Sequence, residues 1–128
     1  MTKQNLFIVG LDEFNLERLL RLPQAKHCDF HAALRVQDIR KVKGFDMPAL
    51  IDKAIAAMEA FDGPIHGVAS YWDFPGTVMV PILARRFGLP GPSMDAVLKC
   101  EHKYWSRLEQ REVIPAHIPR FQAFDPFD

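Results

Sequence analysis

The sequence has few cysteines and no excess of charge of either sign. Cys28 and Cys100 are the only cysteines among 128 residues, which are too few and too widely spaced for a disulfide scaffold. Lys plus Arg and Asp plus Glu number 16 each, so the formal net charge is zero. A balanced chain lacks the electrostatic signature of binding to DNA, RNA or anionic lipid. Neither nucleic acid nor a membrane is therefore expected as a partner.

Long apolar runs are also missing. No segment approaches the roughly 20 apolar residues that cross a bilayer. The first residues lead directly into a strand-like run that is too short and too poorly flanked for a signal peptide. Two cysteines without a disulfide pattern fit a reducing compartment. These absences predict a soluble, cytoplasmic protein.

The glycine-rich phosphate loops are absent. Gly10 stands alone where a dinucleotide-binding fingerprint would need several glycines, and no P-loop lysine motif occurs. Asp12 and Glu13 fall at the start of the first expected helix, where their charges would repel a pyrophosphate from the helix N-terminus. An NAD-type oxidoreductase domain is therefore disfavoured.

A metal site is not expected either. His27, Cys28 and His31 are close in sequence, but their spacing does not match a zinc site, and neighbouring side chains on a strand point to opposite faces. No nucleophile, base and acid can be grouped into a triad from the sequence. No catalytic residue is assigned.

What the sequence does contain is an alternation of strand and helix patterns. Short apolar runs predict strands at 6–9, 29–34 and 67–71, the second with Phe30, Ala32 and Leu34 opposite His31 and Ala33. Helical spacing follows each run: Leu16, Leu19 and Leu20 share a face before Pro23, and further helices are predicted at 47–61 and 78–87. This order predicts an α/β fold with three α/β/α layers and a mostly parallel, Rossmann-like sheet.

Ligands of open parallel sheets bind beyond the carboxyl ends of the strands. The loops after the first and third strands lie there, and the second of them carries two adjacent aromatic residues. Such a pair forms either a wall of a ligand site or an apolar plug over the sheet. The candidate substrate-cleft residues are Gly10, Asp12, Glu13, Ser70, Tyr71, Trp72 and Asp73.

The last third of the chain carries a more specific pattern. Residues 87–104 are FGLPGPSMDAVLKCEHKY, and residues 113–121 are VIPAHIPRF. Ser93 is a good N-cap for a short helix, a second helix is expected at 101–110, and a strand is expected to begin at 118–122. These segments resemble the junction of ATP-grasp enzymes, in which a Gly-Leu-Pro-Gly-Pro-Ser turn ends the N-terminal lobe. The biotin carboxylase-like members are the most similar.

The resemblance implies two parts: residues 1–92 as a pre-ATP-grasp domain, and residues 93–128 as linker helices and the start of the ATP-grasp domain, whose remainder is absent. It implies an ATP-dependent ligase that activates a carboxylate as an acyl phosphate for capture by an amine or a thiol, with magnesium on the ATP phosphates. Lys103 matches the family's nucleotide-binding lysine, although His102 replaces the usual preceding Asp and Trp105 is unusually bulky.

The implied partners are the ATP-grasp domain of the same parent chain, a small-molecule carboxylate, and a second copy, since such lobes form dimers in relatives. The family's magnesium carboxylates and adenine-clamping strands would follow Phe121, so this fragment is expected to be inactive alone and to bind neither ATP nor magnesium tightly. The exposed side of the last helix should be apolar and adhesive. The alternative is a stand-alone flavodoxin-like or receiver-like interaction module, which would need a closing C-terminal helix.

Overall fold

The computed structural model describes residues 2–40, 44, 46–125 and 127. The chain forms two compact units, Met1–Pro92 and Ser93–Asp128. Within the described part of the chain, no helix combines the length and the apolar character that a membrane span requires.

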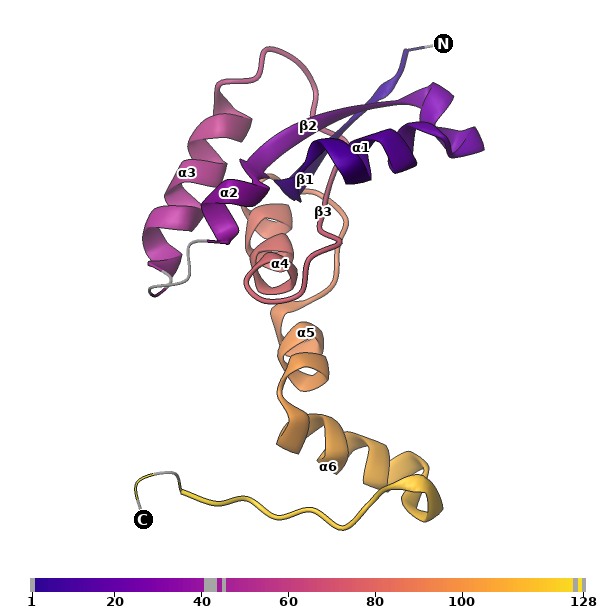
Figure 1. The fold of residues 1–128 in the computed structure, drawn as a ribbon, viewed down its shortest axis with the longest axis vertical. Coiled ribbons are helices and arrows are strands. Elements are labelled where there is room, and N and C mark those ends of the chain that lie inside the picture. Colours follow the sequence, from indigo (N-terminus) through magenta and orange to yellow (C-terminus); the bar gives the residue numbers. More distant parts are fainter. Residues whose placement is uncertain (1, 41–43, 45, 126, 128) are drawn as a thin grey trace. The chain divides into compact units, whose positions relative to one another are not determined.

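The first unit is built on a parallel sheet of three strands: β1 (Gln4–Leu11), β2 (Cys28–Arg35) and β3 (Gly67–Ala69). Their order is β2-β1-β3, so β1 is central and pairs in parallel with both neighbours (Figure 1). Phe7, Ile8 and Val9 of β1 are buried, as the continuous apolar run at 6–9 predicts for a strand covered on both faces. The predicted parallel α/β sheet is confirmed.

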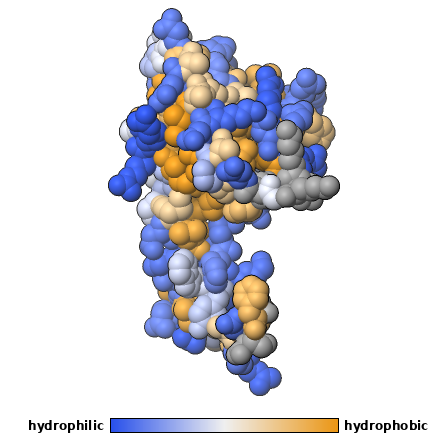
Figure 2. Space-filling view, turned by 90° about the vertical axis from the view of Figure 1, so that its left-hand side faces the viewer, coloured by the Kyte–Doolittle hydropathy of each residue, from blue (hydrophilic) through white to orange (hydrophobic). Residues whose placement is uncertain are grey.

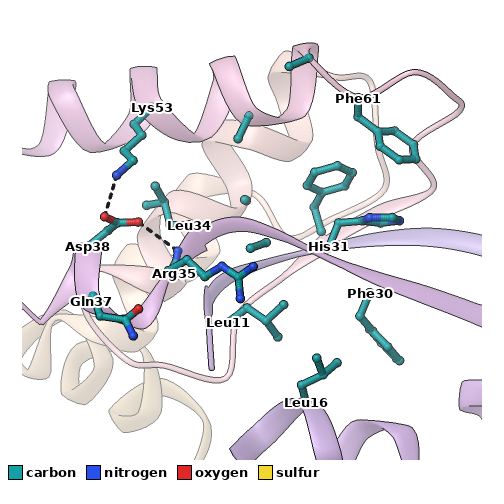
Figure 3. A pocket seen from close by; sticks show the side chains of 15 residues that line it. Leu11, Leu16, Phe30, His31, Leu34, Arg35, Gln37, Asp38, Lys53 and Phe61 are labelled. Carbon is teal, nitrogen blue, oxygen red and sulfur yellow. Dashed lines mark hydrogen bonds and ion pairs between the residues drawn. The ribbon is translucent and has the colours of Figure 1, made fainter. Parts of the chain in front are cut away.

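Helices cover both faces of this sheet. They are α1 (Glu13–Leu20), α2 (Val36–Ile39), α3 (Met47–Glu59) and α4 (Gly76–Arg86), with a 3₁₀ helix, η1 (Pro23–His27). The chain moves from the central strand β1 to β2 at one edge, and then from β2 back across the sheet to β3 at the other edge. Because both crossovers are right-handed and these two steps go in opposite directions, α1 and α3 lie on opposite faces of the sheet. Figure 3 shows these two helices on either side of β2. The arrangement is compatible with three α/β/α layers.

The core lies between the sheet and the pair α3 and α4. Ala54 and Met58 of α3 are buried there with Met79 and Leu83 of α4, and the other apolar residues predicted to share the α3 face pack against this cluster. Asp46 caps α3 by accepting a hydrogen bond of 3.1 Å from the Ala49 N–H. Both the apolar face and the cap agree with the sequence pattern.

Strand β2 does not keep the strict alternation predicted for it. Ile8 pairs with Ala32, but the next residue, Val9, pairs with Leu34, so Ala33 is an extra residue in β2. Ala33 and Leu34 are therefore both 2% exposed in the same core. A bulge of this kind shifts the side-chain alternation by one residue, which a period-two pattern does not reveal.

Helix α1 packs more loosely than its sequence predicts. None of its residues is fully buried, and Leu20, predicted on its inward face, is 58% exposed. Phe14 of the same helix is 62% exposed. Figure 2 shows that hydrophobic patches lie among hydrophilic residues on the face of the molecule that it draws.

The second unit consists of α5 (Met94–Glu101), α6 (Lys103–Val113) and a 3₁₀ helix, η2 (Pro115–His117). Ser93 caps α5 by accepting a hydrogen bond of 3.1 Å from the Ala96 N–H, and an ion pair of 3.0 Å between Lys99 and Glu109 joins the two helices. No described side chain of this unit is fully buried.

The strand predicted to begin at 118–122 does not form; the chain there is irregular. An isolated strand gains nothing from its extended backbone unless a neighbour accepts and donates its hydrogen bonds. This unit has no strand within its described residues that could do so.

Candidate functional site

The loops after β1 and β3 meet at the carboxyl edge of the sheet. The Nε1–H of Trp72 donates a hydrogen bond of 2.9 Å to the carbonyl oxygen of Gly10. The hydroxyl of Tyr71 lies 3.0 Å from that same oxygen and 3.0 Å from Oδ2 of Asp12. It also accepts a hydrogen bond of 3.0 Å from the Asp12 backbone N–H. Three polar groups of the β1 loop are therefore satisfied by two aromatic side chains of the β3 loop.

Ser70 also links these two segments through its side-chain hydroxyl. Its Oγ lies 3.1 Å from the carbonyl oxygens of both Val9 and Trp72, and it accepts a hydrogen bond of 3.1 Å from the Trp72 N–H. Gly76, the first residue of α4, comes so close that a Cβ there would overlap Ser70 Oγ. Ser70 therefore fixes the turn from β3 into α4.

Asp12 is the N-cap of α1, and its carboxylate is already engaged. Oδ1 accepts a hydrogen bond of 2.8 Å from the Asn15 N–H, and Oδ2 accepts one of 2.8 Å from the Asn15 side-chain amide. These bonds from Asn15 lower the pKa of Asp12 below its ordinary value, because they favour the charged carboxylate. Burial raises the pKa of the Tyr71 hydroxyl.

Five of the seven candidate cleft residues are thus brought into one network: Gly10, Asp12, Ser70, Tyr71 and Trp72. Glu13 and Asp73 lie at the same edge with exposed side chains and take no part in it. The polar groups of these five residues are hydrogen-bonded to one another, and these bonds hold the two loops in place. Of the seven candidate residues, Glu13 and Asp73 keep open carboxylates, and part of the Tyr71 ring is exposed.

One residue at this edge was missed by sequence reasoning. The guanidinium of Arg40 lies 5.1 Å from the centre of the Trp72 ring, in a cation–π arrangement, and it is exposed. Arg40 follows α2 in a stretch that the sequence indicates only as a charged connection. Arg40 comes near Trp72 because the sheet has the order β2-β1-β3. No pattern of neighbouring residues in the sequence predicts this contact.

A second hollow follows the free side of the edge strand β2. It is an open groove of about 800 Å³ between α1 and α3, with Leu16 and Phe30 on one side and Lys53 and Phe61 on the other (Figure 3). An ion pair of 2.7 Å between Lys53 and Asp38 lies at one end. Its lining comes from five separate elements, β1, α1, β2, α2 and α3, which is why no sequence motif marks it.

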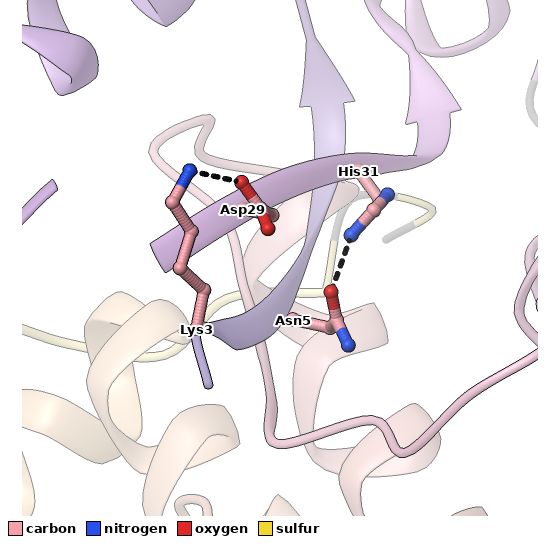
Figure 4. A network of polar contacts seen from close by, with 4 residues as sticks. All are labelled: Lys3, Asn5, Asp29 and His31. Carbon is pink, nitrogen blue, oxygen red and sulfur yellow. Dashed lines mark hydrogen bonds and ion pairs between the residues drawn. The ribbon is translucent and has the colours of Figure 1, made fainter. Parts of the chain in front are cut away.

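His31 and Asp29 of β2 make contacts within the fold. His31 lies over the rings of Phe7 and Phe61, with centroids 5.1 and 4.6 Å away, and its Nε2 is 3.0 Å from the Asn5 side-chain oxygen. Lys3 and Asp29 form an exposed ion pair of 2.7 Å nearby (Figure 4). Among the described residues, no three His, Cys, Asp or Glu side chains are grouped so that they could hold a metal ion.

Lys103, the candidate nucleotide-binding residue, is the first residue of α6 and is exposed. It lines a groove of about 450 Å³ in the second unit, together with Tyr104, Arg107 and Phe121. The rings of Tyr104 and Phe121 meet edge to face with centroids 5.5 Å apart. The sequence pattern indicated Lys103 but not the aromatic pair or Arg107 beside it.

Neither a protein-family model, nor a curated protein, nor a solved structure matches this chain.

Proposed function

We propose that this chain is the N-terminal, substrate-side part of an ATP-dependent carboxylate–amine or carboxylate–thiol ligase of the ATP-grasp type. In this proposal it is cytoplasmic and has no ligase activity by itself. It works with an ATP-grasp domain of the same parent chain, which supplies most of the nucleotide site.

The observation that carries the proposal concerns the turn on which the resemblance rests. The boundary between the α/β unit and the helical unit falls between Pro92 and Ser93, inside the Gly-Leu-Pro-Gly-Pro-Ser turn of residues 88–93. In ATP-grasp enzymes this turn ends the N-terminal lobe. A second point is that α5 and α6 leave large apolar side chains exposed, including Trp105 and Val113. Such surfaces are typical of segments that another domain covers.

In the proposed ligase the carboxyl edge of the first unit forms one wall of the substrate cleft. The hydrogen bonds of Tyr71 and Trp72 to the β1 loop hold this wall rigid. A rigid wall orients a bound substrate without a further loss of conformational entropy during the reaction. Glu13 and Asp73 offer negative charge to the amine partner of the reaction, and Arg40 offers positive charge to a carboxylate. In the second unit, Lys103 would contact the ATP phosphates as a point charge.

Among the described residues, those beside Lys103 do not fit a magnesium ion on ATP phosphates. A magnesium ion on ATP phosphates needs one or two carboxylates that converge on the phosphates. The groove beside Lys103 has no acidic lining residue, and the carboxylate of Asp12 is engaged by Asn15 and Tyr71. The metal ligands of the proposed ligase therefore belong to the ATP-grasp domain.

The test traps the activated carboxylate. ATP and a carboxylate form an acyl phosphate and ADP. Hydroxylamine then displaces phosphate from the acyl group and gives a hydroxamate. The coloured complex of the hydroxamate with ferric ion is measured by its absorbance. The polypeptide encoded by the whole reading frame should form hydroxamate with one class of carboxylate, whereas residues 1–128 should not. A Lys103→Ala variant of the longer polypeptide should have a raised KM for ATP.

The control is Lys26→Ala, which removes an exposed lysine of the first unit and should leave the KM for ATP unchanged. A reading frame that stops after Asp128, or a longer product that forms no hydroxamate with any carboxylate tested, would remove the basis of the proposal. Hydroxamate formation by residues 1–128 alone would contradict the expected lack of activity.

A further inference from the structure

Strand β2 is an edge strand, with β1 on one side and the groove between α1 and α3 on the other. Within the described part of the chain, no strand pairs with its groove side. The register with β1 is regular from Cys28 to Ala32, and the irregularity begins only after Ala32. The edge of a regular strand presents a row of unpaired backbone N–H and C=O groups. An added strand would satisfy these groups.

Apolar side chains line the groove on both sides of this edge. Leu16 of α1 and Phe30 of β2 lie on one side, and Ala57 of α3 and Phe61 lie on the other (Figure 3). Successive side chains of an extended chain point to opposite faces. A strand added beside β2 would therefore place one set of its side chains against Leu16 and Phe30, and the alternate set against Ala57 and Phe61.

The lysine and the arginine of the groove differ in whether their charge is already used. Lys53 is paired with Asp38 at 2.7 Å, and Asp38 also accepts a hydrogen bond of 3.1 Å from the Arg35 backbone N–H. The side chain of Arg35 is exposed and lines the groove, and among the described residues its guanidinium forms no ion pair. Figure 3 shows this guanidinium directed into the groove and away from the Asp38 carboxylate. Its charge is therefore available to an external anion.

The position of Arg35 relates this charge to the direction of an added strand. Arg35 is the last residue of β2, so it lies at the carboxyl end of the strand. An added chain that ends in a free carboxylate beside Arg35 would run parallel to β2, as β1 does. Arginine binds a carboxylate through two parallel hydrogen bonds, a geometry that lysine does not offer.

We infer that the free edge of β2 binds the C-terminal segment of a partner protein as an added parallel strand. The backbone of this segment pairs with residues 28–32, its alternate apolar side chains lie on the two sides of the groove, and its terminal carboxylate binds Arg35. In recognition of this kind, main-chain hydrogen bonds give affinity and the alternate side chains give specificity. None of the seven candidate cleft residues lines this groove, so the inference goes beyond the proposed ligase and does not depend on it.

The test measures binding of fluorescein-labelled peptides to the full 128-residue chain by fluorescence anisotropy. The probe is a mixture of six-residue peptides whose last four residues vary among valine, leucine, phenylalanine and threonine, with a free C-terminal carboxylate. The same mixture with a C-terminal amide should bind about tenfold more weakly, because it lacks the charged contact. A mixture that keeps the carboxylate but is N-methylated at the last four backbone nitrogens should also bind at least about tenfold more weakly, because it cannot donate to β2.

Two variants locate the contact on the protein. Arg35→Gln should abolish the preference for the carboxylate over the amide, and Arg35→Lys, which keeps the charge, should retain part of it. Ala57→Glu, a substitution at an exposed position of α3, should weaken binding of both mixtures, because it places a charge against their apolar side chains. The matched control is Arg85→Gln, which removes an exposed arginine from the last turn of α4 and should leave binding unchanged. Circular dichroism checks that each variant is folded.

Equal binding of the carboxylate and amide mixtures, or a preference that survives Arg35→Gln, would overturn the inference. Failure of every peptide mixture to bind at about 1 mM, the weakest affinity of interest, would overturn it as well. A dimer in sedimentation velocity that Ala57→Glu dissociates would also contradict it, because the edge of β2 would then be covered by a second copy of the chain. Hydroxamate formation by the longer polypeptide is a separate measurement, so the proposed function stands or falls without regard to these outcomes.

Discussion

The indole nitrogen of Trp72 donates a hydrogen bond of 2.9 Å to the backbone carbonyl of Gly10, 62 residues earlier in the chain. This bond, with those of Tyr71, closes the carboxyl edge of the sheet. The same two side chains were open to two interpretations from the sequence, a ligand wall or an apolar plug. Their hydrogen bonds to the β1 loop make them a support that joins the two loops.

Gly10 should tolerate no side chain. Its φ is +86°, and a Cβ would lie 2.5 Å from Ile39 Cδ1 and 2.6 Å from Trp72 Cδ1. Gly10→Ala should therefore lower the free energy of unfolding by about 3 kcal/mol, from a strained backbone and from overpacking. Urea denaturation measures the change. Gly88→Ala is the control, because Gly88 also has a positive φ, +64°, but open space around it; its cost should be about 1 kcal/mol. Equal costs for the two variants would contradict the steric account.

Tyr71 and Trp72 should show a coupled effect on stability. The Trp72 Nε1–H donates to the Gly10 carbonyl oxygen, and the Tyr71 hydroxyl lies within hydrogen-bond distance of the same oxygen. Trp72→Phe alone therefore leaves that oxygen with a partner, and it should lower the free energy of unfolding by about 1 kcal/mol. The double variant with Tyr71→Phe removes both partners and should cost more than the sum of the two single variants. A double-mutant cycle in urea gives the coupling energy. Strict additivity would show that the two side chains do not share this acceptor.

Asp12 should make stability depend on pH in the acidic range. The hydrogen bonds from Asn15 lower its pKa in the folded protein below the ordinary value of 3.8. A carboxylate with a lowered pKa stabilises the fold above the pKa of the unfolded chain, and that contribution is lost as the pH falls through the folded value. An NMR titration of the Asp12 carboxyl carbon should show the lowered pKa, and Asn15→Ala should move it upward. An unchanged titration in Asn15→Ala would rule out Asn15 as the main cause.

Thr77 contains a buried hydroxyl for which the described residues provide no hydrogen-bond partner. An unsatisfied buried hydroxyl destabilises a fold, and valine has nearly the same shape without it. Thr77→Val should raise the free energy of unfolding by about 1 kcal/mol, measured by urea denaturation. Thr77→Ala, which removes the hydroxyl and a methyl group together, separates this effect from loss of packing and should not stabilise. Destabilisation by Thr77→Val would imply a water or another partner on the hydroxyl.

Local patterns in the sequence were enough to predict the main elements. The apolar run of Phe7 to Val9, the caps at Asp46 and Ser93, and the apolar face around Met58 each depend on residues within a few positions of one another. Burial and helix capping act over such short distances, so their signals are present in the sequence. The alternation of these elements was then sufficient to predict a parallel α/β sheet.

The errors arose where neighbours distant in sequence decide the outcome. Ala33 is an extra residue in β2 only because β1 pairs with it in a shifted register. Leu20 is exposed although its spacing matches an inward face. Residues 118–122 have the composition of a strand but no neighbouring strand among the described residues of their unit. A strand exists only as part of a pair, and one sequence segment does not contain its partner.

The sequence by itself determined the order of the main strands and helices of the first unit, the caps at Asp46 and Ser93 and the position of the turn at residues 88–93, because all of these follow from contacts between nearby residues. Only the tertiary structure decided that Tyr71 and Trp72 bind the loop of Gly10, that Arg40 lies over Trp72, and that the cations of α6 share grooves with Phe121 and Arg120. Each of these relationships joins residues that come together only when the chain has folded, since hydrogen bonds and charge interactions depend on distance in space.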